Sequence, residues 1–171
     1  MYRGEWDQAQ SIAEDLLRLS PQRNDATGLV LGHYASGLNL LSAGRFASSR
    51  THLEEVLALY DPTSHSALAH QTGSPPRVGS QGYLGIALFC LGFPDQALAQ
   101  SNAAISEARS LAHPPSLAAG LVIGTRLLCL CADNAALDER AEQLITVATE
   151  QGFPSYRAMG TIYRGYASYD N

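Results

Sequence analysis

The sequence predicts an all-α protein, in which antiparallel helix pairs stack into an α-α superhelix of about eight helices. Apolar residues recur at helical spacing along the chain, and no segment alternates apolar and polar residues for long enough to form a strand. Glycine and proline divide the chain into segments of helical length. Short glycine motifs return in phase with these segments, which indicates a repeated structural unit.

The first half of the chain is predicted to hold helices over residues 5–19, 24–42, 45–60 and 77–91. The first of them has a stripe of apolar residues on one face: Trp6, Ala9, Ala13, Leu16 and Leu17. The third repeats this stripe from Phe46 onward. The segment 61–76 combines polar residues with His, Gly and Pro, so it is expected to be a loop.

Proline marks the start of later helices, because the first helical position needs no intrahelical acceptor for the N–H that proline lacks. Pro94, Pro115 and Pro154 are therefore expected to open helices. The second half of the chain is predicted to hold helices over residues 94–111, from 115 onward, 135–151 and 154–171.

These helices are expected to form a single helical-repeat domain over residues 1–171. Its complete helix pairs are predicted over 24–60, 77–111 and 115–151, with half repeats over 1–20 and 154–171. A stack that ends in half repeats exposes apolar faces that a neighbouring repeat would cover. The chain is therefore expected to be a fragment of a longer protein, and a homodimer through the exposed terminal helices is a possible partner arrangement.

A glycine spacing recurs in two of the predicted pairs, as Gly37 with Gly44 and as Gly85 with Gly92. Gly44 and Gly92 are expected to take the left-handed conformation that ends the first helix of each pair. Gly37 and Gly85 are expected to lie where the second helix crosses the first closely, since a side chain there would keep the two apart.

Each of these turn glycines is followed by a ring residue and then by a small residue. Phe46 and Phe93 are expected to wedge into the angle between the two helices of their pair. Ser49 and Ala97 are expected to allow close contact at the start of the second helix. Residues 4–9 form a third, partial copy of this motif.

This spacing resembles the tetratricopeptide repeat (TPR), whose unit is 34 residues long. The turn glycines here lie 40 and 48 residues apart, and His33 and Gln81 stand where the TPR has tryptophan. In the last complete pair the crossing glycine is missing, with Cys129 or Arg126 in its place according to how the turn is aligned. The resemblance is to a divergent relative of the TPR family.

The whole chain also resembles the C-terminal helical-repeat region of large bacterial proteins that join a class III adenylate/guanylate cyclase domain to an AAA-like ATPase. Related repeats occur in MalT-like and LuxR-like transcriptional regulators. The resembling stretches are Gly44-Arg45-Phe46, His52-Leu53-Glu54, residues 91–97, Ala112-His113-Pro114, Gly152-Phe153 and Gly165-Tyr166-Ala167. Residues 73–78 depart from the usual loop pattern, and Tyr166 stands where these proteins favour Trp.

The resemblance implies a protein–protein interaction or regulatory module of a larger signalling ATPase or cyclase, with the catalytic chemistry in other parts of the polypeptide. In the TPR arrangement the first helix of each pair lines a concave groove. The residues predicted to line it are Leu31, Tyr34, Leu38, Leu41, Gly82, Ile86 and Phe89. Such an apolar groove would suit an amphipathic helix. The alternative is that superhelical curvature buries these residues against the next pair.

The composition argues against several classes of catalytic site and partner. All 11 basic residues are Arg, so a Schiff-base lysine or a P-loop lysine is excluded. The net charge of −5 argues against nucleic acid or an anionic membrane as the partner. No catalytic or cofactor motif is found, so an enzyme is not expected. Three cysteines without an apolar leader fit the cytoplasm, and the longest strongly apolar stretch, 117–124, is too short to span a bilayer.

Histidine and cysteine are the candidate metal ligands. The histidines are His33, His52, His65, His70 and His113, and their spacing favours capping and loop hydrogen bonds over a zinc site. Cys129 and Cys131 are expected to pack in the core. The alternative function is a small-molecule sensor of the MalT type, with a pocket formed by His33, Asn39 and Arg126.

Overall fold

The computed structural model describes residues 3–65 and 68–169, without the side chains of residues 3–6, 70–71 and 169. These described residues form helices joined by short connections, with no strand among them. The predicted all-α class is therefore confirmed. Trp6 and His70 belong to predictions made above, and their side chains lie outside the described part.

Eight long helices carry the fold, and their bounds lie close to those predicted. They are α1 (Arg3–Leu19), α2 (Ala26–Ser42), α3 (Phe46–Leu59), α6 (Pro76–Cys90), α7 (Pro94–Ser110), α8 (Pro114–Cys131), α9 (Asn134–Glu150) and α10 (Pro154–Tyr169). The expected loop 61–76 also contains two short helices, α4 (Pro62–His65) and α5 (Leu68–Thr72). A single 3₁₀ turn, η1 (Pro21–Arg23), joins α1 to α2.

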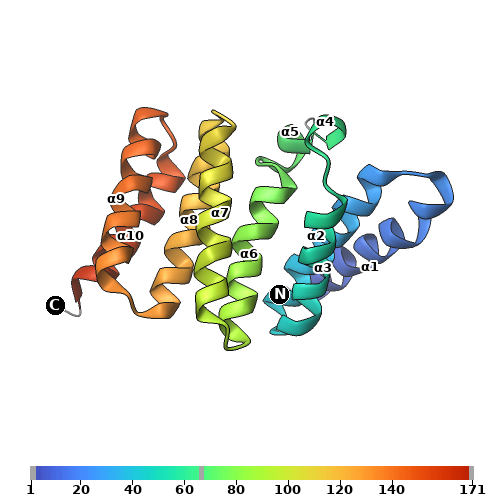
Figure 1. The fold of residues 1–171 in the computed structure, drawn as a ribbon, viewed down its shortest axis with the longest axis horizontal. Coiled ribbons are helices and arrows are strands. Elements are labelled where there is room, and N and C mark those ends of the chain that lie inside the picture. The colour runs from blue at the N-terminus through green and yellow to red at the C-terminus, as the bar shows by residue number, and fades with distance from the viewer. Residues whose placement is uncertain (1–2, 66–67, 170–171) are drawn as a thin grey trace.

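The long helices stack in chain order, with α1 and α10 at opposite ends (Figure 1). Helices α2 and α3, α6 and α7, and α8 and α9 form antiparallel pairs. The first helices of successive pairs also contact one another, so α2 packs on α6, α6 on α8, and α8 on α10. This inner layer is what makes the stack an α-α superhelix of helix pairs.

The largest core cluster lies where the α2–α3, α6–α7 and α8–α9 pairs meet. Its buried members are Leu53, Leu84, Ile86, Leu88, Ala97, Ile123 and Leu127. Because these residues come from four different helices, the core is continuous between neighbouring pairs as well as within each pair. Repeat proteins are stabilised in this way by the interfaces between adjacent repeats.

The two glycines predicted at helix crossings lie at such crossings. A Cβ atom added to Gly37 would lie 2.7 Å from Leu53 Cδ2 of α3, and one added to Gly85 would lie 2.8 Å from the Ala97 carbonyl oxygen of α7. Ser49 is fully buried at the first crossing, and its hydroxyl donates a hydrogen bond of 2.8 Å to the Gly37 carbonyl oxygen. The small residues at the start of α3 and α7 therefore allow the close contact expected of them.

The turns after α2, α6 and α8 share one conformation. Gly44 and Gly92 have φ angles of +73° and +88°, as predicted for the left-handed end of a helix. Ala132 takes the same role with φ 54°, although it is not glycine. Seven residues before it stands Thr125, which is fully buried. Thr125, and not Cys129 or Arg126, therefore occupies the crossing position of the third pair.

Two further expectations about the turn motif are wrong. Phe93 does not wedge between α6 and α7, because its side chain is 42% exposed and lies 5.9 Å from the guanidinium carbon of Arg50 on α3. Gly4 does not form a turn, because it lies inside α1. The N-terminal copy of the motif is thus a likeness of sequence and not of backbone conformation.

Helix α8 is the most apolar of the long helices. Within the described residues it is the one helix that is long and apolar enough to cross a membrane, with 18 residues and a mean hydropathy of 1.5. Half of it is buried inside the fold. A central helix of a repeat stack needs this composition because neighbours cover it on several sides.

Candidate interaction surface

The residues predicted to line a concave groove lie on the inner layer, but to different depths. Gly82 is buried, since a Cβ atom there would lie 2.9 Å from Ile123 Cγ2 of α8, and Ile86 is 6% exposed. Leu31 and Tyr34 pack on a separate cluster formed by residues of α2, α3 and α5 with Tyr60. The remaining three are half-buried: Leu38, Leu41 and Phe89. Contact with the next repeat therefore accounts for Gly82 and Ile86, and binding by the others stays a prediction.

Three tyrosines from three inner helices lie near one another on this layer. They are Tyr34 on α2, Tyr83 on α6 and Tyr156 on α10, and each is half-buried. Tyr83 is close enough to both of the others to influence their ionisation. Together they are called the tyrosine row below. Only Tyr34 is among the residues predicted from the sequence, because packing between repeats is what brings Tyr83 near Tyr34 and Tyr156.

Local packing fixes the outer two members of the tyrosine row. Tyr34 lies over Gly79 of α6, where an added Cβ atom would be 3.0 Å from its ring carbons, so the glycine makes room for the ring. Tyr156 meets the ring of Phe153 edge-on, with the ring centroids 6.0 Å apart. The middle member, Tyr83, packs against the main core cluster.

The hydroxyl groups of Tyr34 and Tyr156 remain protonated over the physiological range. Burial raises the pKa of Tyr34 well above its ordinary value, and the neighbouring Tyr83 raises it further. The pKa of Tyr156 is also raised, mainly by burial and further by Tyr83. Each hydroxyl can therefore both donate and accept a hydrogen bond. Within the described residues none of the three hydroxyls has a hydrogen-bond partner.

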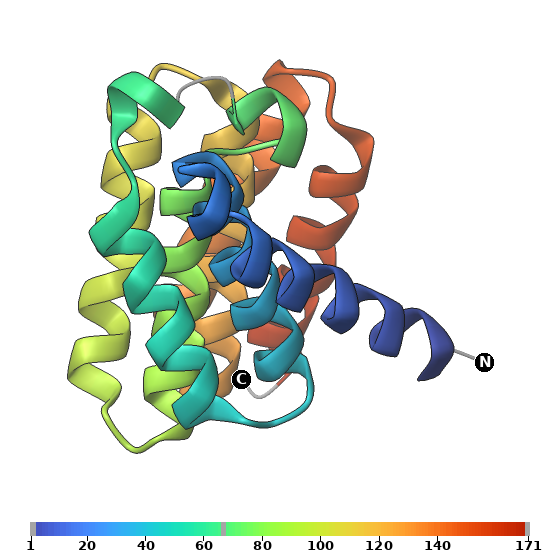
Figure 2. The same ribbon diagram turned by 90° about the vertical axis from the view of Figure 1, so that its right-hand side faces the viewer.

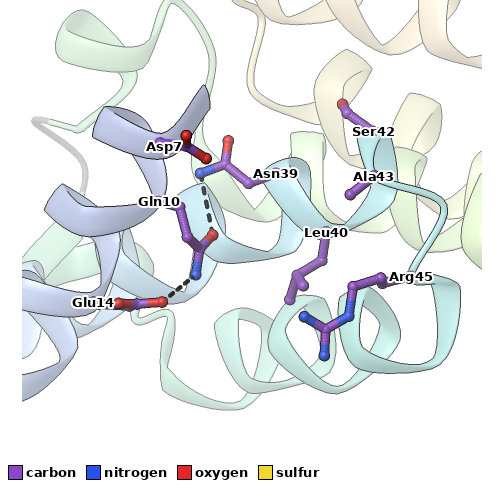
Figure 3. Close-up of a pocket in the computed structure, with 8 residues that line it drawn as sticks. All are labelled: Asp7, Gln10, Glu14, Asn39, Leu40, Ser42, Ala43 and Arg45. Carbon is purple, nitrogen blue, oxygen red and sulfur yellow. Dashed lines mark hydrogen bonds between the residues drawn. The ribbon is translucent and has the colours of Figure 1, made fainter. Parts of the chain in front are cut away.

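A second candidate site is an open cavity between α1 and the end of α2, with a volume of about 720 Å³ (Figure 3). Its lining is mostly polar and consists of Asp7, Gln10, Glu14, Asn39, Leu40, Ser42, Ala43 and Arg45. Gln10 donates a hydrogen bond of 2.9 Å to Glu14 Oε1, and Asn39 Nδ2 lies 3.5 Å from Gln10 Oε1. Asp7, Gln10 and Glu14 of α1 thus line one side of the opening, and Asn39 of α2 and Arg45 line the other.

The structure does not bring together the pocket predicted for a small-molecule sensor. Asn39 lines the cavity just described, whereas His33 contacts His52 of α3 with their Nδ1 atoms 3.1 Å apart. Arg126 is exposed on α8. The three residues therefore lie at separate places and do not line one pocket.

His65 and His113 make local hydrogen bonds of the kind expected of them. Nδ1 of buried His65 accepts from the backbone N–H of Asp61 at 2.9 Å, and Nδ1 of His113 lies 2.7 Å from Ser116 Oγ at the start of α8. Among the described residues no group of three or more His, Cys, Asp or Glu is placed to hold a metal ion. Cys129 and Cys131 are half-buried against core clusters.

Comparisons of the chain with protein-family models, with curated proteins and with solved structures find no match.

Proposed function

We propose that the chain is a protein-binding scaffold of TPR-like repeats, and that its inner layer holds a helical or extended segment of a partner protein. The observation that supports this most directly is the tyrosine row, in which three half-buried phenol groups from α2, α6 and α10 gather without partners of their own among the described residues. A stack built only for stability has no need of polar groups there.

Tyrosine suits this role for physical reasons. Its ring offers a large contact area with few rotatable bonds, and its hydroxyl adds a directional hydrogen bond. Apolar side chains beside the row, such as Leu38 and Phe89, are half-buried and can contribute further area. Affinity in such interfaces is concentrated in a few aromatic anchors.

The wider setting follows from the resemblances. The scaffold would serve a larger ATPase or nucleotide cyclase in the cytoplasm, and its partner would be another protein or another domain of the same polypeptide. The chain would contribute binding and no catalysis of its own. A net charge of −5 favours a partner segment that is neutral or basic.

The test is a selection of displayed peptides of about 16 residues against the purified chain, followed by affinity measurement of the selected peptides. Tyr83→Asp should weaken binding at least about tenfold, since it places a charge at the centre of the tyrosine row. Tyr83→Phe should weaken it less, because the ring remains. Phe93→Asp is the matched control, since this aromatic side chain is 42% exposed in the turn after α6.

Circular dichroism melting of each variant separates loss of binding from loss of fold. If peptides are selected but bind Tyr83→Asp as tightly as the unchanged chain, while Phe93→Asp abolishes binding, the inner layer is not the binding surface. If no peptide is selected, the scaffold proposal itself fails.

The cavity between α1 and α2 supports a second function, a sensor of small polar molecules. Its volume of about 720 Å³ is in the range of ligand sites, and Asp7, Glu14 and Arg45 offer charges of both signs. A thermal-shift screen with sugars and nucleotides tests it. A ligand should raise the melting temperature of the unchanged chain but not of Asn39→Leu, and a screen without any such shift would reject the sensor function.

A further inference from the structure

The repeat unit of this chain is 40 residues long, which allows equivalent positions to be compared between helices. The turn residues Gly92 and Ala132 are separated by this distance, as are the prolines that open α8 and α10, Pro114 and Pro154. The step from Gly44 to Gly92 is longer because it includes the segment with α4 and α5. Each residue of α10 is thus equivalent to the residue of α8 that stands 40 positions earlier.

This equivalence shows that one side of α10 lacks the neighbour that α8 has. Gly160 is equivalent to Gly120, and both lie against the helix that precedes them. Gly165 is equivalent to Thr125, the fully buried crossing position of the third pair. A Cβ atom added to Gly165 would meet nothing within 4 Å, unlike one added at any other described glycine inside α2 to α10.

An uncharged stripe runs along this open side of α10. It consists of Ser155, Ala158, Met159, Ile162, Gly165 and Tyr166. Met159 is 43% exposed, Ile162 59% and Tyr166 61%. Three large side chains at helical spacing form a continuous apolar patch, and such a patch marks an interaction site. In α6 the position equivalent to Ile162 is Gly82, which Ile123 of the next inner helix covers.

At the other end of the stack, α1 lacks a first helix to pair with among the described residues. By the 40-residue period Ile12 of α1 is equivalent to His52 of α3. The longer step of 48 residues makes His52 equivalent to Gln100 of α7, and the next step of 40 makes Gln100 equivalent to Arg140 of α9. His52 contacts His33, and Arg140 lies against Gly124, so these positions face the first helix of their own pair. Ile12 has no such helix among the described residues and is 62% exposed. Helix α1 also projects from the stack, which leaves this side accessible (Figure 2).

We infer that two copies of this chain associate head to tail, with the α1–α2 end of one copy docked on the uncharged stripe of α10 of the other. In this arrangement α10 and the second copy's α1 complete one helix pair, and the superhelix continues from one copy into the next. The stripe itself carries no charge, and Arg164 of α10 is already paired with Glu142 of α9 at 2.6 Å, so the contact between the copies would be apolar. Because the two surfaces differ, the contact can extend beyond a dimer.

This inference rests on the repeat architecture and not on the tyrosine row. The experiment is sedimentation velocity of the full chain from 1 to 200 µM, a range of about two orders of magnitude chosen for weak self-association. The weight-average mass should rise with concentration above the 18.3 kDa of one chain. A monomer over the whole range overturns the inference.

Two single variants determine which surfaces meet. Ile12→Asp blocks α1 and Ile162→Asp blocks α10, and each should remain a monomer when alone. When the two variants are mixed, one intact α10 and one intact α1 remain, so a one-to-one dimer that grows no further should form. Leu111→Asp, at an exposed apolar residue after α7, is the matched control and should associate like the unchanged chain.

The alternatives give different results. If Ile12→Asp alone still dimerises, two α10 helices meet each other, and if Ile162→Asp alone still dimerises, two α1 helices do. Either outcome overturns the head-to-tail arrangement. Tyr83→Asp should leave self-association unchanged, so failure here and failure of the proposed binding role can be told apart.

Discussion

Gly85 shows how much of this fold depends on the absence of single side chains. The Cβ atom of an alanine there would lie 2.8 Å from the carbonyl oxygen of Ala97, which belongs to the backbone and cannot rotate away. The helices of the α6–α7 pair would have to separate. The same substitution at Gly165 meets open space.

These two glycines give a matched stability prediction. Gly85→Ala should lower the free energy of unfolding by about 1–3 kcal/mol, as overpacking of a well-packed contact does. Gly165→Ala should raise it by about 0.5–1 kcal/mol, because alanine loses less backbone entropy in a helix. Urea unfolding at low micromolar protein concentration measures both. Equal effects of the two substitutions would contradict the crossing assigned to Gly85.

The pair formed by His33 and His52 is the residue-scale feature most sensitive to pH. Their Nδ1 atoms lie 3.1 Å apart, so one neutral ring donates to the other. Burial lowers the pKa of both rings, His52 lowers that of His33 further, and Glu55 opposes this in both cases. The folded pKa values thus lie below the ordinary value of 6.5, and the unfolded chain binds more protons.

Stability should therefore fall as the pH drops below about 6.5, because protons favour the unfolded chain there. At pH 7.5 His52→Gln should cost about 1 kcal/mol for the lost hydrogen bond. At pH 5 this cost should shrink, since the unchanged chain has already lost the benefit of the neutral pair. Urea unfolding of both proteins at the two pH values is the measurement. A loss of stability in His52→Gln that is larger at pH 5 than at pH 7.5 would refute the hydrogen bond between the two neutral rings.

At the scale of the helices, the turns decide where each element ends. Gly44 and Gly92 end α2 and α6 in the left-handed conformation at no steric cost, whereas Ala132 ends α8 in the same conformation with a Cβ atom. An L-residue in this region is disfavoured by about 1–2 kcal/mol. The α8–α9 turn is therefore strained where the other two are not.

Ala132→Gly should relieve this strain and raise the free energy of unfolding by about 1 kcal/mol. Ala158→Gly, in the exposed middle of α10, is the control and should lower it by about 0.5–1 kcal/mol. Thermal or urea unfolding of the two variants decides the matter. A loss of stability in both would mean that position 132 is not held in the left-handed region.

The helices could be predicted from the sequence where proline, glycine and apolar period agree, as at Pro94 and Gly92. They could not be predicted where a signal is missing. The short helices α4 and α5 span four and five residues, which is too short for an apolar period to show. Ala132 gives no turn signal, so the crossing position of the third pair was misplaced. Tyr83 and Tyr156 join Tyr34 only through packing between repeats, which local patterns do not contain.

At the scale of the whole molecule, both proposals depend on one inner layer of first helices. The layer places the tyrosine row on a common surface, and its continuation beyond α10 is what a second copy would supply. In the described residues one close contact within it joins Gly82 of α6 to Ile123 of α8. These residues belong to different repeats, so their contact exists only in a superhelix.

A disulfide between Gly82→Cys and Ile123→Cys tests this layer most directly. A Cβ atom at position 82 would lie 3.3 Å from Ile123 Cβ, near the separation of about 3.5–4.5 Å that a disulfide needs. In a chain whose three native cysteines are replaced by serine, oxidation should form this bond within one molecule, detected by mass spectrometry after digestion. The control pair Ile12→Cys with Ile123→Cys should form none within one molecule. A helical protein that forms no bond between positions 82 and 123 would contradict the superhelix.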